Sequence, residues 1–266
     1  MKRIVIIAMF CASACWAQNR FPQTAARDVT MIPFPEAVTV DMALYFPMDR
    51  TGKMTNNYTP TGLDMNLIEA VFTESGYVRG GMWLDGTNDY VSIADDNAFT
   101  PTGTNASITV SCWILATSTS ALKTVVSKDR YATGANRSWT LNIKAGGVVQ
   151  WLVSETASGN EPRVLMETTG TIAPDTWHHV CGRYDGLANK GDVWIDGVED
   201  PTSESQALAG LYNNTQPVRI GANSNGATVS EYFGGRIDEV LFWPRALTDA
   251  EIEDLYARFV VARANQ

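Results

Sequence analysis

Hydrophobic and polar residues alternate along most of the chain beyond residue 38, and this two-residue period is typical of β-strands with one buried face. The alternation is clearest at residues 108–115. Residues 139–144 and 148–154 flank the turn sequence Ala-Gly-Gly and predict a β-hairpin. Further strands are predicted at 38–46, 82–84, 90–93, 123–127, 163–168, 177–184, 192–195, 218–220 and 236–242. Because these strands follow one another at about 8 to 15 residues without helices between them, the pattern predicts an all-β fold, an antiparallel two-sheet β-sandwich.

The C-terminal end contains the one convincing helix signal. Pro244 ends the strand at 236–242, because proline cannot donate a hydrogen bond to a β-ladder. Thr248 followed by Glu251 has the spacing of a capping box and predicts a short helix over residues 249–259. The residues expected to dock this helix on the sandwich are Ile252, Leu255 and Tyr256.

The N-terminus has the pattern of a signal peptide. Lys2 and Arg3 precede a short apolar run at residues 4–10, and small residues follow, so we expect cleavage after Ala17. The alternative is a bacterial lipoprotein signal with lipidation at Cys15, although the usual leucine of that signal is missing. Both interpretations predict an exported protein that is secreted, periplasmic or on the cell surface.

Composition and charge mainly exclude certain classes of binding partner. The formal net charge is −9, and no basic stripe occurs, so neither nucleic acid nor an anionic lipid surface is an expected partner. After the leader, no run reaches the roughly 18 apolar residues that a membrane-spanning helix needs. Residues 18–37 contain three prolines and predict a linker or N-terminal arm, and residues 38–262 predict a single domain.

Several segments resemble, in order, the laminin-G-like domains of the concanavalin A-like lectin-glucanase superfamily. Among them are ALYFPMD at 43–49, GGMWLDGTNDYVSI at 80–93, DTWHHVCGRYDG at 175–186, VWIDGV at 193–198 and GRIDEV at 235–240. The resemblance implies a jelly-roll sandwich and a secreted, non-catalytic module that binds carbohydrate or acts in adhesion. A polysaccharide hydrolase or lyase of the same fold and a cell-surface protein-interaction domain are the alternatives.

The resemblance also implies a structural calcium ion between the first and last strands. Carried over to this chain, its ligands are Asp49 and Asp238. The sequence after Asp49, R-T-G-K, departs from the family pattern, in which an acidic or small residue is more common.

The two cysteines outside the leader, Cys112 and Cys181, both lie in predicted strands. In an exported protein, such a pair either forms a disulfide or remains as two buried thiols. The family places these strands close together, so the resemblance favours a disulfide.

Aromatic residues in loops or at strand ends are the candidates for sugar stacking, and they are Tyr131, Trp139, Trp151, Tyr212 and Tyr232. A catalytic site has weaker support, because no two acids share one strand at the alternating spacing of glycoside hydrolases. Asp238 and Glu239 are adjacent and are expected on opposite faces. His178 and His179 are adjacent too, and cannot easily ligate one metal together.

Overall fold

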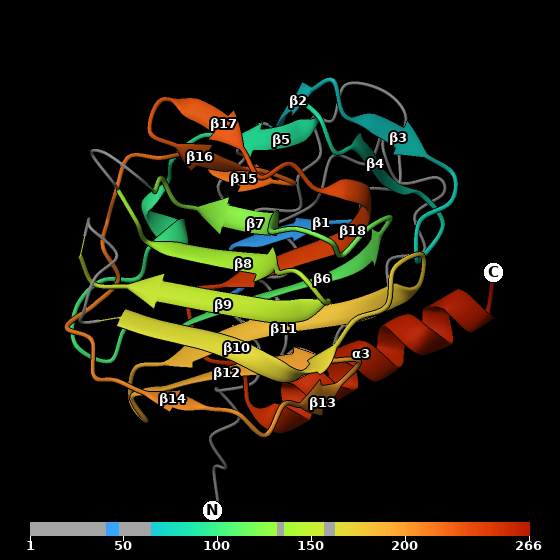
Figure 1. The fold of residues 1–266 in the computed structure, drawn as a ribbon. Helices are drawn as coiled ribbons and strands as arrows, with labels where there is room; N and C mark the ends of the chain where they lie inside the picture. Colours follow the sequence, from blue (N-terminus) through green and yellow to red (C-terminus); the bar gives the residue numbers. More distant parts are fainter. Residues whose placement is uncertain (1–40, 48–64, 132–135, 157–162) are drawn as a thin grey trace, which may run out of the picture. The chain divides into compact units, whose positions relative to one another are not determined.

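The computed structural model describes residues 41–47, 65–131, 136–156 and 163–266, all of which belong to one compact unit, Phe34–Gln266. Asp49, the predicted leader and the predicted arm lie outside the described residues. The described chain forms two antiparallel β-sheets that pack face to face, with one long helix on the outer side (Figure 1). The predicted all-β sandwich is therefore confirmed.

The nine-stranded sheet has the strand order β13-β12-β11-β6-β18-β4-β3, with β1 beside β18 and β14 beside β12. Its strands are β1 (Leu44–Phe46), β3 (Val71–Thr73), β4 (Gly81–Asp85), β6 (Ile108–Ala116), β11 (Trp177–Asp185), β12 (Lys190–Ile195), β13 (Val198–Glu199), β14 (Glu204–Ser205) and β18 (Gly234–Trp243). The last strand lies next to the first, although almost two hundred residues separate Leu44 from its partner Phe242.

The seven-stranded sheet has the order β10-β9-β8-β7-β15-β5-β2. Its strands are β2 (Met65–Ile68), β5 (Tyr90–Ile93), β7 (Lys123–Lys128), β8 (Trp139–Ile143), β9 (Val148–Ser154), β10 (Arg163–Thr171) and β15 (Val218–Ile220). A small separate hairpin, β16 (Asn223–Asn225) with β17 (Thr228–Ser230), was not predicted. It lies near β15 and β5 in Figure 1.

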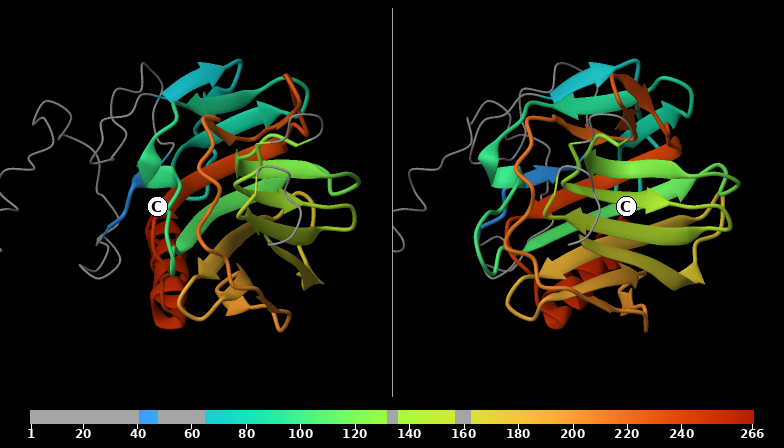
Figure 2. Two further views of the ribbon diagram at one scale, coloured as in Figure 1. Left: turned by 90° about the vertical axis from the view of Figure 1, so that its left-hand side faces the viewer. Right: turned by 60° about the vertical axis from the view of Figure 1, so that its left-hand side comes forward.

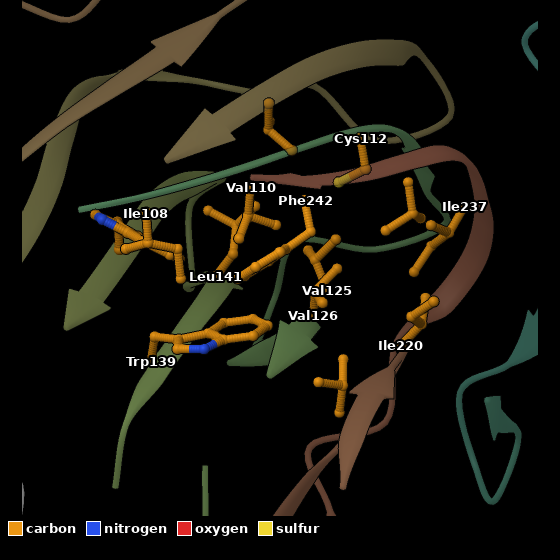
Figure 3. Packing of buried hydrophobic residues seen from close by; sticks show 14 of the residues in the cluster. Ile108, Val110, Cys112, Val125, Val126, Trp139, Leu141, Ile220, Ile237 and Phe242 are labelled. Atoms are coloured by element: carbon orange, nitrogen blue, oxygen red, sulfur yellow. The ribbon is translucent and has the colours of Figure 1, made fainter. Parts of the chain in front are cut away.

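The core fills the space between the two sheets (Figure 3). Trp139 packs against Phe242 of the facing sheet, with ring centroids 5.5 Å apart, and its indole N–H donates to the Phe99 carbonyl at 2.8 Å. Trp151 packs directly against Gly182 of β11, where an added Cβ would lie 2.6 Å from the indole ring. Glycine is needed at position 182 because the ring occupies the space of a side chain.

Helix α3 (Asp249–Ala264) covers the outer face of the nine-stranded sheet, on the side away from the seven-stranded sheet (Figure 2). The predicted capping box between Thr248 and Glu251 is present, and the helix runs five residues beyond its expected end at 259. Ile252 and Leu255 are fully buried as predicted, whereas Tyr256 is partly exposed and stacks on Trp113 at 5.6 Å between ring centroids.

The two cysteines lie on neighbouring strands, but the predicted disulfide is wrong. Cys112 on β6 and Cys181 on β11 are both free and buried. Val180 is opposite Cys112, whereas Cys181 is opposite Ser111, so the cysteines are one position out of register. Side chains alternate between the faces of a sheet. Cys112 therefore points into the core (Figure 3), whereas Cys181 points to the opposite face, where burial raises its thiol pKa to about 12.

Lys128, at the end of β7, is a charged side chain that is completely buried. Its ammonium group donates to the backbone and side-chain oxygens of Asn214 at 2.6 and 2.9 Å and lies 2.7 Å from the Asp95 carboxylate. Burial lowers the pKa of Lys128, and Asp95 opposes this change. These three acceptors account for the three donors of the ammonium group, which is why the charge is tolerated inside the protein.

Candidate functional site

The outer face of the seven-stranded sheet, turned away from the core, carries a band of polar side chains, of which Ser127 and Thr140 are fully buried. One row crosses five strands in register, through Asn66 on β2, Ser92, Arg219, Ser127 and Thr140. The residues before and after these positions on β5 and β15 pack in the core, so strand alternation turns the row outward. This face has two halves with different chemistry.

On the half formed by β7 to β10, the polar side chains bind one another. The Asn142 amide oxygen accepts a hydrogen bond from Thr124 at 2.9 Å, and its NH₂ group donates to Gln150 at 3.0 Å. Gln150 donates to Glu167 at 2.8 Å, and Lys144 reaches the same carboxylate at 2.6 Å. Lys144 and Gln150 lower the pKa of Glu167. Because these groups already have partners, this half offers a ligand few free donors or acceptors.

The other half has polar side chains without protein partners. We call the set formed by Asn66, Tyr90, Ser92, Arg219 and Tyr232 the Arg219 surface. Within the described residues, no hydrogen bond occupies the side chains of these five residues, and the Nη1 atom of Arg219 is both buried and without a partner. The rings of Tyr90 and Tyr232 lie 6.3 Å apart between centroids, tilted by 44°.

The electrostatics of the Arg219 surface are set by the guanidinium group. Burial lowers the pKa of Arg219, and the tyrosines Tyr90 and Tyr232 are the groups that oppose this change. Burial raises the pKa of Tyr232, with Tyr90 acting in the same direction and Arg219 against it. The surface therefore presents a partly desolvated cation that interacts with two tyrosines.

The β16–β17 hairpin sits against β7 and borders this face. The hydroxyl of Tyr131 lies 3.2 Å from Ser230 on the hairpin, and its backbone N–H donates to Ser224. Glu231 follows the hairpin with a left-handed backbone (φ 55°), and its carboxylate accepts from Thr124 at 3.0 Å. Glu231 is thus held in place directly before Tyr232.

The five aromatic residues predicted to stack on sugars differ in their burial. Trp139 and Trp151 are completely buried between the sheets, so they have no face for a ligand and these two predictions are wrong. Tyr131 and Tyr232 are partly exposed around the seven-stranded sheet and the hairpin. Tyr212 is also partly exposed, in the segment whose backbone bonds to Ser154 at the end of β9.

Two acids of β18 lie on the same side of the nine-stranded sheet, contrary to the prediction of opposite faces. The pairing of β18 with β6 shifts between Asp238 and Leu241, and Glu239 has a left-handed backbone (φ 49°), which marks a β-bulge. The Glu239 carboxylate therefore turns toward the helix side and accepts from the Tyr45 hydroxyl at 2.6 Å. The bulge adds one residue, so the alternation is interrupted at this point.

The Asp238 carboxylate, predicted as a calcium ligand, is fully buried and bonded to the backbone. It accepts from the amides of Tyr77 and Val78 at 2.8 and 3.0 Å, and from its own neighbour Glu239 at 2.9 Å. Three or more His, Cys, Asp or Glu residues do not gather into a metal-binding group anywhere in the described ranges. Its predicted partner Asp49 lies outside those ranges.

Both histidines form hydrogen bonds within the protein. His178 bonds to Asp196 at 2.7 Å and accepts from the Ala173 amide at 3.1 Å. His179 is completely buried beneath helix α3, with Nε2 2.7 Å from the Ser111 hydroxyl. A substrate has no access to the His179 ring, so the Ser111–His179 contact has the character of a buried structural pair.

A second partly exposed row crosses the nine-stranded sheet beyond helix α3. Paired positions on five strands place Val71, Trp83, Arg236, Leu115 and Trp177 side by side. Val71 and Trp83 are among the exposed large hydrophobic residues, and the Arg236 guanidinium lies 5.6 Å from the Trp83 ring centroid. We call this the Trp83 row.

Sequence reasoning missed Arg219 and Tyr90. A signal for both was present, because Val-Arg-Ile at 218–220 and Tyr-Val-Ser-Ile at 90–93 place these residues opposite the apolar ones. Only the register shows that Arg219 lies beside Ser92, more than a hundred residues earlier in the chain.

The chain belongs to the concanavalin A-like lectin/glucanases superfamily, whose family model matches residues 85–253. No curated protein matches the chain. Part of the family, as its name states, consists of carbohydrate-binding proteins and part of glycan-cleaving enzymes, so membership leaves both classes open.

Solved structures with a similar fold include binding domains of clostridial toxins. The binding domain of Paraclostridial Mosquitocidal Protein 1 has a TM-score of 0.64 at 15% identity, with 82% of this chain and 52% of that chain covered. The botulinum neurotoxin serotype G binding domain gives 0.61 at 14% identity, covering 81% and 50%. A botulinum neurotoxin type C structure, described as entering cells through two ganglioside molecules, gives 0.61 at 11%, covering 84% and 52%. The chain spans about half the length of these structures, and the likeness shows the fold.

Proposed function

We propose that this chain is a non-catalytic carbohydrate-binding module and that the Arg219 surface is its binding site. The observation that carries the proposal is a set of polar side chains around two tyrosine rings that have no hydrogen-bond partner among the described residues. Carbohydrate sites combine aromatic rings, which pack on the C–H faces of sugars, with a few polar groups that fix orientation. Tyr90 and Tyr232 supply the rings, and Asn66 and Ser92 supply hydrogen-bonding groups.

The fold supports the same proposal at a coarser level. The superfamily contains lectins, and one structurally similar botulinum neurotoxin chain is described as acting through gangliosides, which are glycolipids. Asp238 and Glu239, the two acids that the β-bulge brings to one side of β18, are buried, and backbone amides and a tyrosine hydroxyl already bond to them.

The experiment is a glycan array followed by calorimetry with the strongest neutral or charged hit. Tyr232→Ala and Tyr90→Ala should each weaken binding about tenfold or more, taking for a sugar on one ring the roughly 1 to 3 kcal/mol that a nucleobase gains by stacking on one. Tyr212→Ala is the matched control, a partly exposed tyrosine outside the Arg219 surface, and should bind as the unchanged protein does. If all three variants lost affinity equally, or if none of them lost affinity, the binding site would lie outside the Arg219 surface.

An enzyme and a protein-interaction domain are the competing functions, and each gives a different result. Release of reducing sugar from a bound polysaccharide, lost on substitution of an acid, would identify a glycan-cleaving enzyme. The alternative of a protein partner is favoured by the Trp83 row, where an exposed tryptophan and valine lie side by side. Trp83→Ala should leave glycan binding intact if the Arg219 surface is the site.

A structural calcium ion held by Asp49 and Asp238 is also part of the proposal. Two buried acids, Asp238 and Glu239, support it, as does the pairing of β1 with β18, because Phe46 lies opposite Val240 and the chain leaves β1 beside the acids. The ion would connect the first strand to the last. Metal that binds only the native state stabilises it by about 2.7 kcal/mol at a hundredfold excess over Kd.

The calcium proposal is tested by the melting temperature with millimolar Ca²⁺ or with chelator. Asp49→Asn is the informative variant, because Asp238 also holds the Tyr77 and Val78 amides and its loss would destabilise the fold without any metal. Chelator should lower the melting temperature of the unchanged protein and have no effect on Asp49→Asn. A melting temperature that chelator does not change would rule out the ion.

Export through the N-terminal leader completes the proposal, with the mature protein beginning after Ala17 or carrying lipid on Cys15. The charged start and the apolar run at 4–10 support it. Mass spectrometry of the protein from its native host distinguishes the two forms by the mature N-terminus and by the added mass of a lipid. Recovery of the uncleaved chain would contradict both. No helix that the described residues form has the length and apolarity to cross a membrane.

A further inference from the structure

We infer that the Arg219 surface selects acidic sugars, in which a carboxylate or a sulfate group binds the Arg219 guanidinium. The inference rests on the proposed function and adds the class of ligand to it. It is carried by a cation that has no counter-ion among the described residues and that interacts electrostatically with two tyrosines.

Arg219 differs from four arginines of the domain that pair with carboxylates, and among the described residues Arg236 is likewise without an ion pair. Arg137, Arg183, Arg245 and Arg258 each form an ion pair with a carboxylate, at N···O distances between 2.6 and 3.2 Å. The groups that interact electrostatically with Arg219 are Tyr90 and Tyr232, neither of which carries a carboxylate. Within the described part of the chain, Arg219 thus forms no ion pair.

The Nη1 atom of Arg219 is also buried without a hydrogen-bond partner. A buried donor that lacks an acceptor carries a free-energy cost of about 1 to 3 kcal/mol, and more for a charged group. A planar guanidinium binds the two oxygens of a carboxylate, or those of a sulfate, with parallel hydrogen bonds. The Nη1 atom itself is closed to solvent, so an anionic ligand group would approach the part of the Arg219 side chain that remains exposed and would supply the missing counter-ion.

The residues beside Arg219 fit a sugar ring that carries such a group. Tyr90 and Tyr232 offer ring faces, and the Ser92 hydroxyl and the Asn66 amide offer donors in register with Arg219. A neutral sugar would use the rings and these donors, but it would leave the guanidinium without a compensating charge. The surface thus distinguishes acidic from neutral sugars through one residue.

In a chain of net charge −9, nearby acids are the natural counter-ions for Arg219. The acids near the Arg219 surface, however, accept hydrogen bonds from other residues. Asp89 is buried and accepts from the Asp85 amide at 2.9 Å. Glu69 accepts from Asn88 at 2.8 Å, and Glu231 from Thr124 at 3.0 Å. These hydrogen bonds hold the acids to their own neighbours, and none of the three carboxylates is paired with Arg219.

The test uses the full chain on an array that pairs each acidic saccharide with a neutral counterpart. Oligogalacturonates are paired with their methyl esters, sialyllactose with lactose, and sulfated galactan fragments with desulfated ones. Calorimetry then compares the unchanged protein with Arg219→Gln, Arg219→Lys and Arg236→Gln. The last variant is the control, since it removes the same charge from a partly exposed arginine on the other sheet.

We expect binding of the acidic member of a pair at least tenfold tighter than the neutral one. Arg219→Gln should lose about 10- to 100-fold in affinity, as expected for hydrogen bonds to a charged group. Arg219→Lys should lose less, and Arg236→Gln should match the unchanged protein. Which pairs respond shows whether the ligand group is a carboxylate or a sulfate. Melting curves of the variants confirm that they are folded.

Other results overturn the inference in distinguishable ways. Equal binding of acidic and neutral members that Arg219→Gln does not alter would reject acidic selectivity and leave carbohydrate binding in place. Equal losses in Arg219→Gln and Arg236→Gln would show a general charge effect instead of a site. Absence of binding to every saccharide on the array would reject both the inference and the proposed function.

Discussion

Acidification should destabilise this domain through His179. The imidazole is completely buried, with Nε2 2.7 Å from the Ser111 hydroxyl and Nδ1 buried without a partner. Trp113 and Tyr256 lie against it at 5.3 and 5.8 Å between ring centroids. Burial lowers the pKa of His179 to about 4, and the Asp196 carboxylate opposes this change only in part.

The size and sign of the effect follow from this pKa. Above about pH 6.5, the imidazole is neutral in the folded and the unfolded chain, so it makes stability independent of pH. As the pH falls from 6.5 toward 4, the unfolded chain gains a proton that the folded chain does not accept, and the free energy of unfolding decreases. A change from 6.5 to about 4, at 1.36 kcal/mol per unit, corresponds to a loss of about 3 kcal/mol.

Urea unfolding at several pH values between 4 and 7 measures this loss. His179→Gln should remove about 3 kcal/mol of the pH dependence over that range. His178→Gln is the matched control, because it replaces the chain's other histidine and leaves His179 in place. With two histidines, the imidazole resonances can be followed singly by NMR. A His179 resonance that titrates near pH 6.5, or equal pH slopes in both variants, would refute the reasoning.

Three further predictions concern packing, a buried charge and the thiols. Gly182→Ala should destabilise the domain by about 1 to 3 kcal/mol in urea unfolding, because the new Cβ would lie 2.6 Å from the Trp151 ring. Adding Trp151→Phe to this variant should recover part of the lost stability, and a Gly182→Ala variant as stable as the unchanged protein would contradict the packing. Lys128→Met should lower the free energy of unfolding by about 3 to 5 kcal/mol in the same assay, since it leaves the buried oxygens of Asn214 without their donor. An unchanged free energy of unfolding would contradict this prediction. In the protein cleaved after Ala17, a thiol reagent should leave Cys112 and Cys181 unmodified in the native state and find two thiols after unfolding without reductant. No thiol after unfolding would indicate a disulfide.

Much of the secondary structure could be predicted because it depends on short-range pattern. The two strands predicted around Ala-Gly-Gly occur as β8 and β9. Thr248 and Glu251 form the capping box that their spacing predicts. In each case, the residues that decide the structure lie within a few positions of one another. The weakly patterned β16–β17 hairpin, of three residues a strand, was missed.

The site residues were harder to predict, because exposure depends on what packs against a strand from elsewhere. Trp139 and Trp151 have the aromatic character of a sugar platform but lie between the sheets, where the facing sheet covers them. Tyr232 lies between β17 and β18 and is partly exposed, and the residue beside it, Tyr90, comes from a strand far earlier in the chain. Aromatic residues serve both purposes, and sequence alone does not distinguish them.

The sequence by itself determined the fold class, the C-terminal helix and the face on which most strand residues lie, because these follow from a local period of two or of 3.6 residues. Only the tertiary structure decided which residues meet across strands. The register of β6 and β11 separated the two cysteines, and the bulge at Glu239 brought two acids to one side. The register of β15 and β5 placed Arg219 beside Ser92. Strand pairing joins residues that are far apart in the chain, and a shift of one position moves a side chain to the opposite face.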